Sequence, residues 1–239
     1  MSAAICVLAL LSTTSYVKAD LMDDAIAEAT RIAGGHENRS LSFSNKEVKS
    51  ISDLHMEKMP EYVISLDLMS NSISSLDGLD CPNVEELRLS NNKLKNLKGK
   101  INASKVTKLI ISNNKLSSLD GIENFPHVTD LNISNISALY VFDDSGKKEK
   151  NELKSLSGIE KLQELEKLQA GHLPLKSLEG IEKLSKLKVL RVTNSGKITE
   201  DMIIQLSTKL PDCDIDYIID DGQEIKHFKN GEQVKGKHK

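Results

Sequence analysis

Apolar residues recur at a fixed spacing along most of the chain. Three segments align without gaps: VISLDLMSNSISSL from Val63, VEELRLSNNKLKNL from Val84 and VTKLIISNNKLSSL from Val106. Each fits the pattern LxxLxLxxNxLxxL, in which x is mostly polar. Self-similarity at a period of about 20 residues indicates a stack of similar coils, because one coil cannot bury its apolar side alone.

The repeats can be counted through their second apolar position. This position falls at Leu66, Leu87, Leu109 and Leu131, in steps of 21, 22 and 22 residues, and it returns at Leu168 and Leu190, again 22 apart. The one long step, of 37 residues, equals a repeat of 22 with an insertion of 15, which we place near residues 137–152. Upstream, LSFSNKEVKSISDL from Leu41 is a degenerate copy. We therefore expect about seven coils over residues 41–218.

Each repeat predicts one short strand followed by a turn. Alternate side chains of a strand face opposite sides, so Leu66 and Leu68 point into the core. An asparagine follows the strand in three repeats, and its amide can bond the backbone of its own coil and of the next. We expect this ladder to consist of Asn71, Asn92 and Asn114 and to stop there, because the matching later places hold Ile136, Leu173 and Ser195.

The pattern resembles the leucine-rich repeat family, in particular the 22-residue type of bacterial internalins and of a eukaryotic phosphatase regulator. The resemblance covers residues 41–218. It implies an α/β solenoid, a leucine-rich repeat horseshoe with a parallel β-sheet on the concave side, a mostly irregular or 3-10 helical convex side, and short helices at the ends. Both ends of the chain resemble secreted planctomycete-type leucine-rich repeat proteins, through the helix–Gly–Gly start and the segment ending in LPDCDI.

The resemblance also implies a function. Such solenoids are non-catalytic scaffolds that bind a protein partner through the concave face, and no cofactor is expected. The alternative is an intracellular regulatory subunit of the phosphatase-regulator type. Outside the repeats, and without residues 1–19, only about 20 residues remain at each end, too few for a catalytic domain. We therefore do not expect an enzyme.

Strand alternation assigns residues to the predicted binding face. The residues beside the inward leucines form rows across the stack, with small residues such as Ser90 and Ser112 along one edge. Arginine is enriched at binding hot spots, and the near absence of aromatic residues favours a charge-steered partner. The expected contact residues are Asp67, Glu86, Arg88, Lys108, Asp130, Asn132, Lys167, Gln169 and Arg191.

The two ends predict caps for the stack. In residues 20–40, Asp20 can cap a helix that Gly34 and Gly35 end. Residues 198–210 predict a second helix, and residues 215–218 a strand. Residues 219–239 predict a hairpin with an Asn230-Gly231 turn and a basic tail.

Residues 1–19 differ from the rest of the chain. A short apolar run over residues 3–11 precedes small residues at Val17 and Ala19, which predicts a signal peptide cleaved before Asp20. The run is too short to span a bilayer. We expect a secreted, periplasmic or cell-surface protein, and the alternative is a cytoplasmic protein that keeps these residues.

Composition and charge narrow the possible partners and chemistry. Aromatic residues make up 3% and the formal net charge is -3, so we expect no nucleic-acid partner, since neither stacking platforms nor a basic field is present. The six histidines form no closely spaced pair, and we expect no metal site. Cys81 and Cys213 lie on opposite sides of five predicted strands, about 20–25 Å apart at about 4.8 Å per strand, and should be free thiols.

Overall fold

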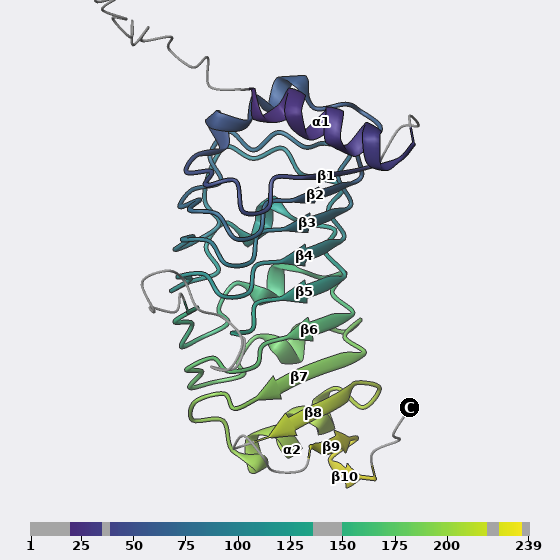
Figure 1. The fold of residues 1–239 in the computed structure, drawn as a ribbon. Coiled ribbons are helices and arrows are strands. Elements are labelled where there is room, and N and C mark those ends of the chain that lie inside the picture. The colour runs from purple at the N-terminus through teal and green to yellow at the C-terminus, as the bar shows by residue number, and fades with distance from the viewer. Residues whose placement is uncertain (1–19, 35–38, 136–149, 219–224, 236–239) are drawn as a thin grey trace, which may run out of the picture.

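The computed structural model describes residues 20–34, 39–135, 150–218 and 225–235, and all structural statements below concern these ranges. Its ten strands form one sheet in chain order, parallel from β1 to β8 and antiparallel from β8 to β10 (Figure 1). Each strand therefore pairs only with its neighbours in sequence, as a stack of coils requires. The strands are β1 (Ser40–Ser42), β2 (Ser65–Asp67), β3 (Glu86–Arg88), β4 (Lys108–Ile110), β5 (Asp130–Asn132), β6 (Lys167–Gln169), β7 (Val189–Thr193), β8 (Asp214–Ile218), β9 (Lys226–Lys229) and β10 (Glu232–Val234).

The inward leucines set the register of the sheet. Leu66 pairs with Leu87, Leu87 with Leu109, and the column continues without a slip to Ile215 in β8. A slip of one residue would turn each of these side chains to solvent, so the apolar pattern fixes the pairing. Behind this column, the later apolar positions of each coil fill one continuous core: Ile73, Leu94, Leu116, Leu153 and Leu175, then Leu76, Leu97, Leu119, Leu156 and Leu178.

The side of each coil opposite the sheet is made of turns and short 3-10 helices, as expected. These are η1 (Ile51–Leu54), η2 (Met56–Lys58), η3 (Ile122–Asn124), η4 (Ile159–Lys161) and η5 (Ile181–Lys183). Gly121 precedes η3 with φ +91, and a Cβ there would lie 2.2 Å from the carbonyl group of Leu97 in the coil before. Both the left-handed backbone and the close approach of two coils thus require glycine at this bend.

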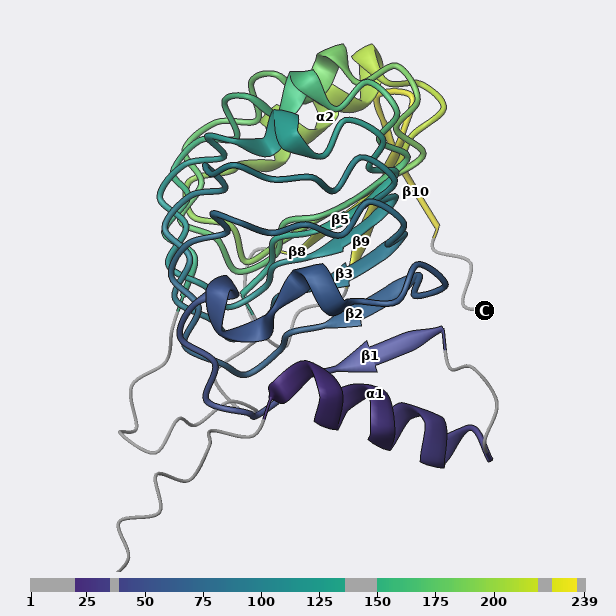
Figure 2. The same ribbon diagram turned by 90° about the horizontal axis from the view of Figure 1, so that it is seen from above.

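A helix covers the first coil. Helix α1 (Leu21–Ile32) begins at Asp20, whose Oδ1 accepts from Met22 N at 3.0 Å. Its buried residues, Met22 and Ala29, belong to the core, and the helix lies along β1 (Figure 2). Lys58 Nζ pairs with the carboxylates of Asp20 and Asp23 and ties the helix start to η2.

The C-terminal elements close the other end of the stack. Helix α2 (Glu200–Lys209) is capped by Thr199, and β8 follows it. The predicted hairpin is formed by β9 and β10, with Asn230 (φ 48) and Gly231 (φ 81) in the left-handed region. Strand β9 pairs with β8, so the hairpin extends the sheet, and the rings of Tyr217 and Phe228 meet edge to face with centroids 6.4 Å apart.

Buried asparagine side chains join successive coils where the chain leaves each strand. Asn92 Nδ2 donates to the carbonyl oxygen of Leu68 in the preceding coil at 2.8 Å and to that of Leu89 in its own coil at 3.1 Å, and its Oδ1 accepts from Ile73 N at 2.9 Å. Asn71 and Asn114 bridge their coils in the same way. These amides bond backbone groups that water does not reach.

The ladder does not stop at Asn114, so that prediction is wrong. Asn151 forms the next rung: its Nδ2 donates to the carbonyl oxygens of Ile111 and Ile133, and its Oδ1 accepts from Asn114 N and Leu116 N at 3.2 and 3.1 Å. In the earlier coils the ladder asparagine lies five residues after the inward leucine, and the same spacing from Leu131 predicts Ile136. The insertion ends just before Asn151 and so moves the ladder residue to that position. Of the predicted insertion 137–152, residues 137–149 lie outside the described ranges.

Beyond Asn151 the ladder changes its chemistry. Asn135 Nδ2 donates to the carbonyl oxygens of Asn151 and His172, which links the coil to the next one, where Leu173 holds the ladder position. Ser195 follows, and its Oγ donates to the carbonyl oxygen of Ala170 at 2.8 Å. In this coil the hydroxyl group of Ser195 takes the place of the asparagine amide of the earlier coils.

Candidate partner-binding surface

The predicted contact residues lie in two rows on the concave sheet. The first row runs through Ser65, Glu86, Lys108, Asp130, Lys167 and Val189, and the second through Asp67, Arg88, Ile110, Asn132, Gln169 and Arg191. Residues within a row are direct register partners on adjacent strands, which places them about 4.8 Å apart. All are half-exposed except Arg191, which is exposed.

Glu86 is the centre of the first charged cluster. Its Oε1 lies 2.9 Å from Arg88 Nε and 3.1 Å from Lys108 Nζ. The Arg88 contact is an ion pair by distance without hydrogen-bond alignment, and the Nε atom itself is buried. The cluster carries one carboxylate against two cations, and its net charge is therefore positive.

A second charged pair joins the next two strands. Lys167 Nζ donates to Asp130 Oδ2 at 2.9 Å. Beside it, the Oδ1 of Asn132 accepts from Ser112 Oγ and from Ser134 N, both at 3.0 Å, which fixes the orientation of the amide. Asp67, at the other end of the second row, uses Oδ1 to accept from Met69 N at 2.9 Å.

Three of the small residues beside these rows do not extend the surface, whereas Ser134 and Thr193 are half-exposed. Ser90 and Ser112 are only 3% exposed, because the chain turns inward there towards the asparagine ladder. Gly171 is also buried, and a Cβ at this position would lie 2.5 Å from Thr193 Oγ1. The accessible concave face is thus about two side chains wide at β3, β4 and β6.

The third charged cluster contains two residues that the sequence reasoning missed. Asp216 of β8 accepts from Arg191 Nε at 3.1 Å through Oδ2, and its Oδ1 lies 2.8 Å from His227 Nδ1 in β9. These strands continue the second row, since Arg191 pairs with Asp216 and Asp216 with His227. The alternation of Ile215, Asp216 and Tyr217 indicates that Asp216 faces outward, but the predicted rows extend only to the last clear repeat.

A second row of amides, also missed, borders the concave face. The residues before Asn71, Asn92 and Asn114 have a left-handed backbone: Ser70, Asn91 and Asn113 have φ of 55, 57 and 51. Asn113 Nδ2 donates to Asn91 Oδ1 at 2.9 Å, and Asn91 Nδ2 to Ser70 Oγ at 3.4 Å. Asparagine tolerates this backbone better than most residues do. The doublets Asn91-Asn92 and Asn113-Asn114 were the sequence signal.

Comparisons with known proteins bear on the fold. No protein-family model and no curated protein matches the chain. Among solved structures, the internalin inlF of Listeria monocytogenes aligns with 84% of this chain at a TM-score of 0.54 and 18% sequence identity. The fold is a leucine-rich repeat solenoid.

The aligned part is 55% of the inlF chain, so this protein spans about half of that length. The internalin inlC2 of the same species aligns with 78% of this chain and 89% of its own, at a TM-score of 0.47 and 18% identity. A leucine-rich repeat protein of Leptospira interrogans aligns with 74% of this chain and 59% of its own, at a TM-score of 0.40 and 18% identity.

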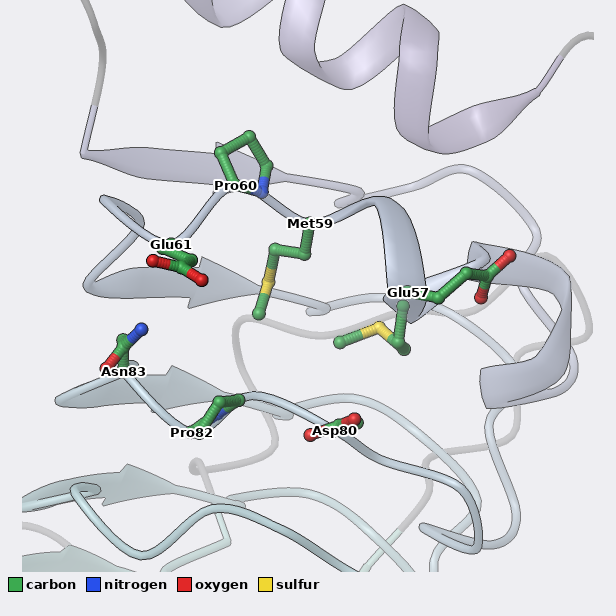
Figure 3. A pocket seen from close by; sticks show the side chains of 8 residues that line it. Glu57, Met59, Pro60, Glu61, Asp80, Pro82 and Asn83 are labelled. Carbon is green, nitrogen blue, oxygen red and sulfur yellow. The ribbon is translucent and has the colours of Figure 1, made fainter.

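One hollow of the solenoid lies away from the concave rows, in the loops of its first coils (Figure 3). It has a volume of about 240 Å³, and Met56, Met59, Pro60, Glu61 and Asp80 are among the residues that line it. Asp80 already accepts from Asn102 Nδ2 at 2.7 Å. None of the predicted contact residues lies there.

The buried thiols show no feature of reactive cysteines. Cys81 and Cys213 are both free, as predicted, and both are buried. Burial raises the pKa of each thiol to about 12, with Asp80 adding to the effect at Cys81 and Asp214 at Cys213. Such thiols stay protonated and are poor nucleophiles at neutral pH.

Among the described residues, no group of three or more His, Cys, Asp or Glu side chains is placed to hold a metal ion. None of the helices that these residues form is long and apolar enough to cross a membrane.

Proposed function

We propose that this protein is a non-catalytic scaffold that binds a protein partner through the concave face of its sheet. The observation that carries the proposal is the pair of polar rows, which hold accessible side chains in one register over β2 to β7. Every coil packs on its neighbours, so the face is preorganised, and little conformational entropy is lost on binding.

The distribution of charge indicates the kind of protein surface that fits. Along the first row the sign alternates from Glu86 to Lys108, Asp130 and Lys167. A partner with charges in the complementary order can exchange these ion pairs for its own. The exchange costs little, because exposed pairs contribute only about 0–1 kcal/mol each. Binding of this kind is steered by charge and weakens as salt rises.

Arg88 and Lys108 are the proposed centre of the interface. They share one carboxylate, that of Glu86, which leaves the cluster with excess positive charge. The Nε of Arg88 is buried, but the side chain is 42% exposed, so a carboxylate of the partner can bind the outer nitrogens of the guanidinium. Arg191 is the second anchor, although Asp216 already engages it.

The test is partner capture from the extracellular proteins of the source organism. We expect Arg88→Glu with Lys108→Glu to abolish capture. The neutral pair Arg88→Gln with Lys108→Gln should weaken it, and it controls for repulsion from Glu86. The matched surface control is Lys183→Glu with Lys186→Glu, which reverses two exposed lysines outside the two rows. If both reversed pairs capture the partner as the wild type does, the concave assignment is wrong.

We further propose that the protein is secreted or displayed at the cell surface after cleavage before Asp20. Asp20 caps α1, so a chain that begins there keeps the whole described fold, which supports the proposal. The alternative is a cytoplasmic regulatory subunit that retains residues 1–19, which lie outside the described ranges. Mass spectrometry of the mature N-terminus separates the two: a chain starting at Met1 or Ser2 in the organism rules out cleavage.

A further inference from the structure

One flank of the stack, outside the concave sheet, carries a line of lysines. After the ladder position, each coil passes through an inward apolar residue with an outward residue on either side. In the third coil these are Lys93 and Lys95 around Leu94, which is fully buried. The alternation is that of an extended chain, so the two side chains point to solvent when the middle one points inward.

Backbone hydrogen bonds keep these outward positions aligned from coil to coil. Lys115 N donates to the carbonyl oxygen of Leu94 at 2.9 Å, and Lys176 N to that of Lys154, also at 2.9 Å. The bond of Lys115 to an inward residue of the preceding coil recurs from Lys93 N to Ile73 O and from Lys197 N to Leu175 O. The outward residues therefore form a continuous surface along the stack.

The charge of this surface is opposite to that of the chain. Its outward positions hold seven lysines and only two acidic residues, Glu47 and Glu152, whereas the whole chain has a net charge of -3. All seven lysines are exposed, and six of them form no ion pair with a described residue: Lys49, Lys93, Lys95, Lys154, Lys176 and Lys197. We call all seven the lysine stripe: Lys49, Lys93, Lys95, Lys115, Lys154, Lys176 and Lys197.

A row of hydroxyl and amide groups runs beside the lysine stripe. In each of its members the side-chain oxygen accepts from the backbone N–H two residues later, as Ser75 Oγ does from Asp77 N at 3.1 Å. Each hydroxyl hydrogen or amide NH₂ can then donate to a bound molecule. The row consists of Ser50, Ser75, Asn96, Ser118, Ser155 and Ser177.

We propose that the lysine stripe binds an extended anionic polysaccharide, bearing carboxylate or sulfate groups, that lies along the stack. From Lys49 to Lys197 there are six steps between coils, or about 29 Å at about 4.8 Å each, so a linear polyanion contacts lysines on several coils. Its affinity comes from the counterions that the polymer releases. The neighbouring hydroxyl and amide donors match the hydroxyl and acidic oxygens of sugars.

Other polyanions fit these positions less well. The lysine stripe and its hydroxyl row contain no aromatic residue, so a single-stranded nucleic acid would find no platform for its bases. An anionic membrane presents a plane, whereas the lysines form a line on the side of a curved stack. A polysaccharide requires neither stacking nor a flat surface.

Dextran sulfate is the probe, and uncharged dextran of equal length is its control. We expect the wild-type protein to bind only the sulfated polymer, with an affinity that falls as NaCl is raised. Replacing Lys93, Lys95, Lys154 and Lys176 by Gln should weaken binding about tenfold or more at low salt and lower the slope of log K against log salt by about three. Matched melting curves show that the variant is folded.

Two controls give the experiment its meaning. The first control variant replaces four exposed lysines outside the lysine stripe by Gln: Lys183, Lys186, Lys209 and Lys235. It changes the net charge by the same amount as the stripe variant and should bind dextran sulfate nearly as the wild type does. The concave variant Arg88→Glu with Lys108→Glu should also bind dextran sulfate, so this test can fail or succeed independently of the proposed function. Equal losses in the two four-lysine variants, no binding by the wild type, or tighter binding to single-stranded DNA or to anionic vesicles would overturn the proposal.

Discussion

The side chain of Asn151 accepts a hydrogen bond from the backbone N–H of Asn114, 37 residues earlier in the chain. The same oxygen accepts from Leu116 N, and the amide nitrogen donates to two carbonyl oxygens. One side chain thus bonds four backbone groups of two adjacent coils and carries the asparagine ladder across the insertion. The stack is continuous at the point where its repeat pattern is broken.

Asn151→Ala should be strongly destabilising. It removes the partners of four backbone groups in a place that is 1% exposed, and each buried group left without a bond costs about 1–3 kcal/mol. We expect the free energy of unfolding in urea to fall by about 3 kcal/mol or more. Asn96→Ala is the control, because Asn96 bonds only Lys98 N at the surface, and it should cost about 1 kcal/mol or less. Equal, small losses would show that Asn151 is no rung.

The same relationship predicts which deletion is tolerated. Removing residues 136–150 joins Asn135 to Asn151 and recreates the asparagine doublet of the two preceding coils, so the fold and its melting temperature should be nearly preserved. Removing residues 143–152 takes away Asn151 and should lower the melting temperature by several degrees more. Circular dichroism melting of both variants checks this. A more stable 143–152 deletion would contradict the ladder.

Periodicity made most of the fold predictable. Inward leucines 21 or 22 residues apart fix the strand register, because any slip would expose the whole column. Both end helices and the hairpin also followed from local signals, such as the Asp20 cap and the Asn230-Gly231 turn. The role of Asn151 could not be predicted in this way. It depends on where the coil resumes after the insertion, and the spacing counted from Leu131 does not show that.

The candidate surface was predictable to a lesser degree. Alternation within each strand identified the residues that face outward. It could not reveal that Glu86 is shared between Arg88 and Lys108, since side-chain pairing depends on rotamers across strands. The lysine stripe was equally hidden, because its members come from separate coils and only the stacking brings them into line.

The two thiols should be inert until the protein unfolds. In a chain that begins at Asp20, Cys81 and Cys213 are the remaining cysteines, and both are buried. We expect no reaction with a disulfide reagent such as DTNB on the native protein within minutes and two thiols per chain in urea. One or more fast-reacting thiols in the native protein would contradict their burial.

Alkaline pH should destabilise the fold through the same thiols. Burial raises the pKa of both from an ordinary value of 9.0 to about 12 in the folded protein. Their contribution to stability is therefore complete below pH 9 and is lost as the pH rises towards 12, because the unfolded state releases the protons first. The variant Cys81→Ala with Cys213→Ala should show a shallower fall of the unfolding free energy above pH 9. Parallel curves for the two proteins would contradict this assignment.

Gly121→Ala tests the close packing of coils at the bends. The residue has φ +91, and an added Cβ would lie 2.2 Å from the Leu97 carbonyl group, so the coils must separate. Gly78→Ala is the matched control, with φ +83 and no atom within 4 Å. We expect the control to lose about 1–2 kcal/mol of stability and Gly121→Ala clearly more, measured by urea unfolding. Similar losses would mean that the coils are not in contact there.

The concave face itself is tested most directly by photo-cross-linking from two matched glutamines. Gln169 lies in the second row of the sheet, and Gln205 lies exposed on α2, away from the rows. A photoreactive phenylalanine analogue replaces each in turn, and the protein is irradiated with the extracellular proteins of its source organism. We expect a specific cross-linked partner from position 169 alone, and we expect it to be lost when Arg88 and Lys108 are reversed to Glu. A partner cross-linked from position 205 and not from 169 would contradict the concave assignment.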